Sequence, residues 1–140
     1  MYEDVLIPTD GSEGAKRGVE YAIDIARKYG ATVHTLYVVD ERTYGRTPAL
    51  SSDELFLEEL EKRGEEALDE VVAEAEELDL EVVRACKRGV PHEVILEYVD
   101  EHDVDLIVMG RHGRGEHGHP HIGSCTDRVL RIAEIPVLPV

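Results

Sequence analysis

Short apolar, β-branched runs alternate along this chain with segments in which apolar residues recur every three or four positions. The runs lie at Tyr2–Pro8, Thr32–Val39, Leu80–Ala85, Asp105–Met109 and Val137–Val140. Apolar strands that alternate with helices predict a parallel sheet with right-handed crossovers and helices on both of its faces. The sequence therefore predicts an α/β fold.

The helices are expected between these strands. The first opens at Ser12 and stops at Gly30, and the second begins within 51–53, with acidic residues on its solvated face. Pro91 takes the first position of the third helix, after a turn at Gly89. The last helix spans about Ser124 to Ala133, where Ser124 and Asp127 have capping-box spacing.

With 140 residues and no composition break, the chain is expected to form one domain over residues 1–140. No apolar stretch is long enough to span a membrane, and the first residues lack the features of a signal peptide, which predicts a cytoplasmic protein. Cys86 and Cys125 have neither disulfide-framework nor metal-site spacing, so they are interpreted as structural thiols. The polar connection Asp40–Ser52 is long for a compact domain and is a candidate lid or partner contact.

The formal net charge of −16 excludes binding to nucleic-acid backbones and to anionic membrane surfaces. Asp and Glu number 31 against 15 Lys and Arg, and the chain contains no Asn or Gln. An acidic surface poor in Lys keeps a protein hydrated in concentrated salt, where self-repulsion is screened. One hypothesis is a halophilic host, and the alternative is an acidic protein from a GC-rich or hot-living organism.

A spaced glycine pattern follows the apolar run that ends at Met109. It consists of Gly110, two residues, Gly113, nine residues, and then Gly123 and Ser124. Glycines allow a backbone to approach a ligand closely, and the amides of a following helix N-terminus favour an anion. The pattern predicts an anion cradle at a strand end, and the alternative is a plain loop excursion.

Asp10 follows another strand end and precedes a helix. Its carboxylate could accept hydrogen bonds from an amino group or a ribose hydroxyl, or hold a cation. Alternatively, Asp10, Gly11 and Ser12 simply turn the chain and cap the helix. These two readings are evenly balanced.

Two familiar nucleotide motifs do not apply. Gly113, Gly115 and Gly118 satisfy a GxGxxG pattern, but His119, Pro120 and His121 follow in place of a helix. The chain also has no GxxxxGK[ST] loop, which excludes an ordinary P-loop ATPase.

Four histidines crowd into ten residues, namely His112, His117, His119 and His121. They could offer imidazoles to a transition metal, or to phosphate when protonated, and the alternative is an exposed polar loop. No spacing reveals a Ser/His/Asp or Cys/His arrangement, so the sequence alone identifies no catalytic residue.

Taken together, the residues resemble the universal stress protein family, and specifically its ATP-binding branch. The match covers essentially the whole chain, including 5–12, 36–40, 89–91, the glycine pattern and 124–130. The resemblance implies a five-stranded parallel sheet of order 3-2-1-4-5 with helices on both faces.

The resemblance also implies the contacts of an ATP molecule. Adenine would lie against Asp10 and Val38, with Pro8 and Thr9 beside them. The ribose would lie near Gly89 and Pro91, and Met109 and Gly110 would border the ribose and α-phosphate. The phosphates would be held by Gly113, Gly123, Ser124, Cys125 and Thr126, with Mg²⁺ or Mn²⁺ bridging their oxygens.

The implied function is a nucleotide-dependent stress regulator or switch, in which ATP binding changes the order of nearby loops. Dimers in the family often pair through the last strand, for which Val137–Val140 is the candidate, although Pro139 lacks a strand donor. Two alternatives remain open: a slow metal-dependent ATP hydrolase, and a dimeric interaction module with a vestigial nucleotide site.

Overall fold

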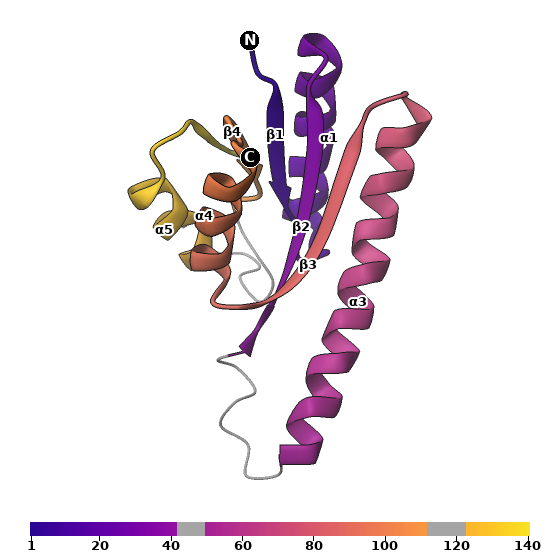
Figure 1. Ribbon diagram of the computed structural model, residues 1–140, viewed down its shortest axis with the longest axis vertical. Helices are drawn as coiled ribbons and strands as arrows, with labels where there is room; N and C mark the ends of the chain where they lie inside the picture. Colours follow the sequence, from indigo (N-terminus) through magenta and orange to yellow (C-terminus); the bar gives the residue numbers. More distant parts are fainter. Residues whose placement is uncertain (42–49, 112–122) are drawn as a thin grey trace.

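The computed structural model describes residues 1–41, 50–111 and 123–140, without the side chains of 50–53. Within them, one five-stranded parallel sheet has the order β3-β2-β1-β4-β5. This confirms the expected fold class (Figure 1). The strands are β1 (Asp4–Pro8), β2 (Thr32–Asp40), β3 (Val82–Gly89), β4 (Leu106–Met109) and β5 (Val137–Pro139), and the helices are α1 (Glu13–Tyr29), α3 (Leu50–Glu77), α4 (Pro91–His102) and α5 (Ser124–Ile132).

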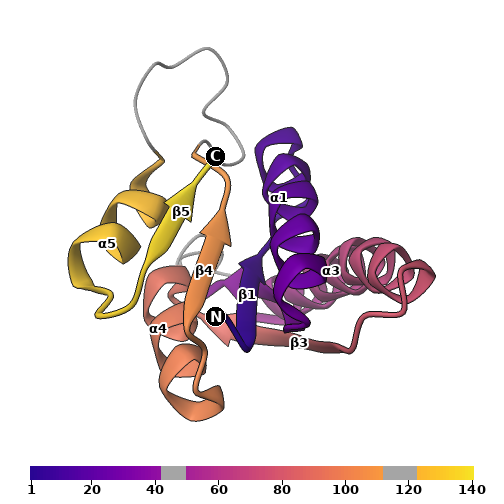
Figure 2. The same ribbon diagram turned by 90° about the horizontal axis from the view of Figure 1, so that it is seen from above.

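The helices cover the two faces of the sheet in pairs. Figure 2 shows α1 and α3 on one side and α4 and α5 on the other. Side chains of alternate strand residues follow this division: Val5 and Ile7 pack with α1, whereas Leu6 packs with α4. The central strands β1, β2 and β4 are thus buried from both sides, as their continuous apolar sequences require, whereas the edge strands β3 and β5 are partly exposed.

Local sequence signals explain where two helices begin and end. Ser12 is the N-cap of α1, and its hydroxyl accepts a hydrogen bond from the Ala15 amide at 3.2 Å. Gly30 ends α1 in the left-handed conformation, with φ of 67°. Pro91 is the first residue of α4, where its missing N–H costs nothing. These expectations are confirmed.

Three sequence expectations are wrong in detail. Strand β3 covers Val82–Gly89 in place of Leu80–Ala85, because its pairing with β2 continues to the Asp40–Gly89 pair. Helix α3 begins slightly earlier than expected, at Leu50. The capping box at Ser124 does not form, because Gly123 is the N-cap of α5 and no side chain caps that helix.

Neither cysteine forms a disulfide, and both are partly buried. Cys86 lies under α3, where burial and the charges of Glu65 and Glu61 raise its pKa to about 11. Cys86 is therefore a protonated packing residue at neutral pH, in line with its interpretation as a structural thiol. Among the described residues, no helix is both long and apolar enough to span a membrane.

Candidate functional site

The carboxyl ends of four neighbouring strands bring most of the predicted site residues to one edge of the sheet. Strand order reverses between β1 and β4, and ligands of open α/β sheets bind at such a point. Strand β1 ends at Pro8 and is followed by Thr9 and Asp10, and the neighbouring β4 ends at Met109 and is followed by Gly110. The remaining described candidates come from the ends of β2 and β3 and from the first turns of α4 and α5: Val38, Gly89, Pro91, Gly123, Ser124, Cys125 and Thr126.

The turn after β1 is built by side chains that bond to its own backbone. The Ser12 amide donates to Oδ1 of Asp10 at 2.9 Å, and the Gly11 amide donates to Oγ1 of Thr9 at 3.2 Å. Gly11 has a φ of 79°, which favours glycine there. Asp10 therefore shapes the turn, and its two carboxylate oxygens have the capacity to accept more than this one bond. The structural reading of Asp10 is confirmed, and the ligand reading remains compatible with it.

Two hydrogen bonds join the segment after β4 to the start of α5. Oγ1 of Thr126 donates to the Gly110 carbonyl at 2.8 Å, and the Gly123 amide donates to the Arg111 carbonyl at 2.6 Å. Thr126 is 4% exposed. Its hydroxyl proton is thus committed within the protein, so Thr126 can face an anion only through its backbone amide.

The first turns of two helices point their amides toward this edge. An α-helix leaves its first N–H groups without an acceptor inside the helix, and its dipole is positive at that end. Neither Val90, the N-cap of α4, nor Gly123, the N-cap of α5, provides a side-chain cap. This arrangement favours an anionic group beside the exposed Ser124.

The connection from β3 to α4 contains Gly89 and Pro91. The backbone of Gly89 has a conformation that only glycine adopts easily. Gly89 has a φ of 151°, and a Cβ added to it would lie 2.7 Å from Cγ2 of Val94. The start of α4 is therefore packed tightly onto the end of β3. Both residues are partly buried.

Gly110 has a packing role that the sequence reasoning missed. A Cβ on Gly110 would lie 2.6 Å from the carbonyl carbon of Gly14, and one on Gly18 would lie 3.4 Å from the Gly110 amide nitrogen. The first turns of α1 therefore pack directly onto the end of β4. The spacing of Gly14 and Gly18, four residues apart on one helix face, was the available signal.

The C-terminal residue also supports this edge. The Arg111 amide donates to the Val140 carbonyl at 2.8 Å, and the Val140 amide donates to the Met109 carbonyl at 2.9 Å. Through these bonds Val140, the residue after β5, holds Arg111 beside the end of β4. Sequence reasoning assigned neither Arg111 nor Val140 to the site, and no local motif marks them.

Some sequence predictions fall outside the described residues. These are Gly113, the histidines at 112, 117, 119 and 121, and most of the 40–52 connection. Among the residues that the structure describes, no group of three or more His, Cys, Asp or Glu side chains could hold a metal ion.

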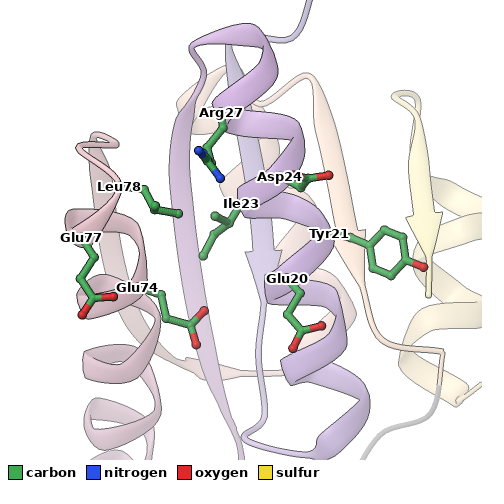
Figure 3. Close-up of a pocket in the computed structure, with 8 residues that line it drawn as sticks. All are labelled: Glu20, Tyr21, Ile23, Asp24, Arg27, Glu74, Glu77 and Leu78. Atoms are coloured by element: carbon green, nitrogen blue, oxygen red, sulfur yellow. The ribbon is translucent and has the colours of Figure 1, made fainter.

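A hollow of about 580 Å³ lies elsewhere, between α1 and α3 (Figure 3). Its lining is mostly charged: Glu20, Tyr21, Ile23, Asp24, Arg27, Glu74, Glu77 and Leu78. Burial, followed by the charges of Glu20, Glu70 and Glu77, raises the pKa of Glu74. None of the predicted site residues lines this hollow, and its negative charge is unsuited to a phosphate.

The fold and this edge define a class: a parallel α/β protein with glycines at its strand ends and helix N-termini along the same edge of the sheet. The sequence profile of the universal stress protein family matches residues 1–140, and the chain belongs to that family.

Two curated relatives come from Methanocaldococcus jannaschii. Universal stress protein MJ0531 is 38% identical over 140 residues, which cover 100% of this chain and 82% of that protein. Universal stress protein MJ0577 is 31% identical over 154 aligned residues, which cover 100% of this chain and 95% of that protein.

Solved structures show the same architecture. The structure of MJ0577 superposes with a TM-score of 0.92 at 28% identity and covers 100% of this chain and 96% of that one. The universal stress protein UspA from Lactobacillus plantarum has a TM-score of 0.85 at 29% identity, covering 99% of this chain and 97% of that one.

Proposed function

We propose that this protein is an ATP-binding universal stress protein that acts as a nucleotide-dependent regulator. The observation that carries the proposal is the pairing of Gly110 with Thr126, which brings the strand end at β4 and the uncapped start of α5 together. Amides and the positive helix end then face one region, a combination that suits phosphate.

The other strand ends are suited to a nucleoside. Asp10 lies one strand away from the β4 end, with Thr9 and Pro8 beside it, and Val38 belongs to the apolar cluster under α4. A carboxylate beside an apolar surface matches the amino group and the flat face of adenine. Gly89 and Pro91 would then border the ribose, and Gly113 would join Gly123, Ser124 and Cys125 around the phosphates.

Proteins of the same fold have been solved with adenine nucleotides. One is a universal stress protein in complex with cAMP, with a TM-score of 0.67 at 23% identity. Another is the universal stress protein from Archaeoglobus fulgidus in complex with dAMP, with a TM-score of 0.70 at 22% identity. These likenesses concern the fold, and the choice of ATP for this chain rests on the glycine pattern.

Several features of the proposal concern the whole protein. Residues 1–140 form a single cytoplasmic domain, and two copies pair through the edge strand β5. Mg²⁺ or Mn²⁺ accompanies the triphosphate. The acidic surface is an adaptation to salt, a statement that fails if the protein stays folded after dialysis to low salt.

Mass spectrometry of the small molecules released by heating the purified protein tests the ligand, and ATP is the expected species. Titration of Ser124→Asp then tests the phosphate position. An acidic residue in the first turn of α5 is favourable for the helix dipole but repels phosphate, so thermal stability is retained while ATP affinity falls at least about tenfold.

Ser124→Asn is the matched neutral control and keeps most of the affinity. If Ser124→Asp binds ATP as tightly as the parent, the phosphates do not lie at α5. Gly113→Val provides a second variant, because a branched side chain blocks close backbone approach. Release of ADP over hours at stoichiometric protein concentration would favour the hydrolase, and the absence of any bound nucleotide would favour the interaction module.

A further inference from the structure

A chain of buried polar side chains crosses from the sheet to α4, away from the proposed nucleotide site. His34 of β2 is 5% exposed, and Tyr98 of α4 is 1% exposed. Nε2 of His34 lies 2.9 Å from Oδ1 of Asp4, the first residue of β1, and Nδ1 lies 2.7 Å from the Tyr98 hydroxyl. Both ring nitrogens of a buried histidine are therefore satisfied.

The chemistry of the partners assigns the protons in this chain. The Asp4 carboxylate only accepts hydrogen bonds, so Nε2 of His34 carries a proton. Burial, with a smaller contribution from the charge of Asp4, raises the pKa of Tyr98 to about 12. Tyr98 is therefore a phenol at neutral pH, and its hydroxyl group is hydrogen-bonded to Nδ1 of His34.

A stacked ring limits the movement of Tyr98. The His102 ring lies on it with centroids 3.8 Å apart and planes 13° apart. Nδ1 of His102 also lies 3.1 Å from the carbonyl oxygen of Tyr98, one helical turn earlier. The phenol is thus held by an aromatic surface at its side and by His34 at its tip.

The remaining buried contacts of α4 are apolar. Val94, Ile95 and Val99 pack with Leu6, Leu36 and Ile107 of the sheet. Hydrophobic contact is non-directional, so such a face tolerates small shifts of a helix along its axis. A hydrogen bond depends steeply on distance and angle, so the Tyr98–His34 bond specifies one axial position.

That axial position matters at the opposite end of the same helix. Helix α4 begins at Pro91. Its Val94 side chain packs so closely on Gly89 that a Cβ atom on Gly89 would not fit. A short helix moves as a unit, so a shift at Tyr98 is transmitted to Val94 and Pro91.

We propose that Tyr98, oriented by His34 and Asp4, is a positioning residue that sets the ribose-side wall of the nucleotide site through α4. The proposal rests on the proposed function for the identity of the ligand. The structural half of the proposal is that the Tyr98 hydroxyl controls the position of the β3–α4 junction. This part does not depend on any ligand.

Tyr98→Phe tests it, because this substitution removes one oxygen atom and keeps the ring. In the nucleotide-free protein, hydrogen exchange of the Val94 amide, which bonds to the Val90 carbonyl at 3.0 Å, should accelerate at least about threefold. With nucleotide, the ratio of ATP to 2′-deoxy-ATP affinity should change by about threefold, since less than one hydrogen bond of binding is at stake.

Val71→Ala is the matched control, because Val71 belongs to the core on the α1 and α3 face and its truncation lowers stability without touching α4. It should leave both readouts unchanged. Asp4→Asn keeps an acceptor for Nε2 of His34 and should rescue most of the parent behaviour, whereas Asp4→Ala should resemble Tyr98→Phe.

The outcomes separate the two proposals. Unchanged Val94 exchange in Tyr98→Phe, or equal acceleration in Val71→Ala, overturns the positioning role whether or not nucleotide binds. An altered exchange rate with an unaltered affinity ratio overturns the link to the ribose. A parent protein that binds no adenine nucleotide overturns the proposed function, and the exchange result still decides the structural half.

Discussion

Helices α3 and α4 lie on opposite faces of the same strands and are attached to them by different chemistry. Arg84 of β3 pairs with Glu65 and Asp69 of α3, and Arg88 pairs with Glu54 and Glu61. The acidic side chains of these pairs are 38–68% exposed and the two arginines 29–34%, whereas the Tyr98–His34 bond that holds α4 is buried. Exposed ion pairs are screened by salt, and buried hydrogen bonds are not.

This contrast suggests that the stability of the two faces depends on different interactions. The α3 face combines close steric packing with surface charge, so its stability should respond to side-chain size and to ionic conditions. The α4 face combines an apolar cluster with one directional polar chain, so it should respond to the loss of single atoms. Three variants test the α3 side of this comparison.

The largest effect is expected for Gly64→Ala. A Cβ at Gly64 would lie 2.4 Å from the ring of Tyr37, which is 6% exposed and has little room to move. Alanine gains about 1 kcal/mol in helix propensity, but overpacking costs more, so we expect a net loss of about 2 kcal/mol in unfolding free energy. Urea denaturation measures it.

Glu66→Ala, on the exposed side of the same helix, is the control and should change stability by less than about 0.5 kcal/mol. A stabilised Gly64→Ala protein would show that α3 is not packed closely on Tyr37. The claim that the α3 face depends on close steric packing would then be wrong.

A smaller effect of opposite sign is expected for Thr35→Val. Thr35 is fully buried in β2, and its hydroxyl has no hydrogen-bond partner among the described residues. Valine has nearly the same shape without the polar atom, so the unfolding free energy should rise by about 1 kcal/mol. A loss of stability in thermal denaturation would instead indicate that this hydroxyl has a bound partner, such as water.

The smallest effect is expected for Glu74→Gln, at the hollow between α1 and α3. Burial and the neighbouring carboxylates raise the pKa of Glu74 in the folded protein, so its charge destabilises the fold at neutral pH. Because most of the Glu74 side chain still faces solvent, which screens these interactions, the gain from Glu74→Gln should be only about 0.3 kcal/mol at low salt.

The size of this stability gain depends on pH and salt. In acid, below the ordinary value of 4.5, Glu74 is protonated in both folded and unfolded states and the difference from glutamine disappears. In 2 M NaCl the repulsive part is screened, leaving the smaller contribution of burial. A gain that grows with added salt would contradict the electrostatic origin.

The sequence was sufficient for the elements that depend on near neighbours. Gly30 and Ser12 mark the ends of α1, and Pro91 marks the start of α4, because helix termini are set by local backbone geometry and by side-chain oxygen atoms within one turn. The alternation of apolar strands with helices likewise predicted the parallel sheet, since only a sheet covered on both faces buries such strands.

For the candidate site, sequence reasoning predicted where the strand ends would meet but not how each residue is used. Asp10 was evenly divided between a turn and a ligand, and its bond to the Ser12 amide is now defined. Thr126 was expected among the residues that hold the phosphates, and the structure shows that its hydroxyl donates to the Gly110 carbonyl. Such partners are many residues apart and have no common local signature.

Periodicity and turn chemistry by themselves determined the α/β class, the order of elements along the chain, and the strand ends that carry the glycines. Those properties depend on interactions within a few residues. Only the tertiary structure decided that Gly110 makes room for α1, that Gly123 rather than Ser124 is the N-cap of α5, and that His34 joins Asp4 to Tyr98. These facts depend on the distance between segments far apart in sequence, and packing in three dimensions sets that distance.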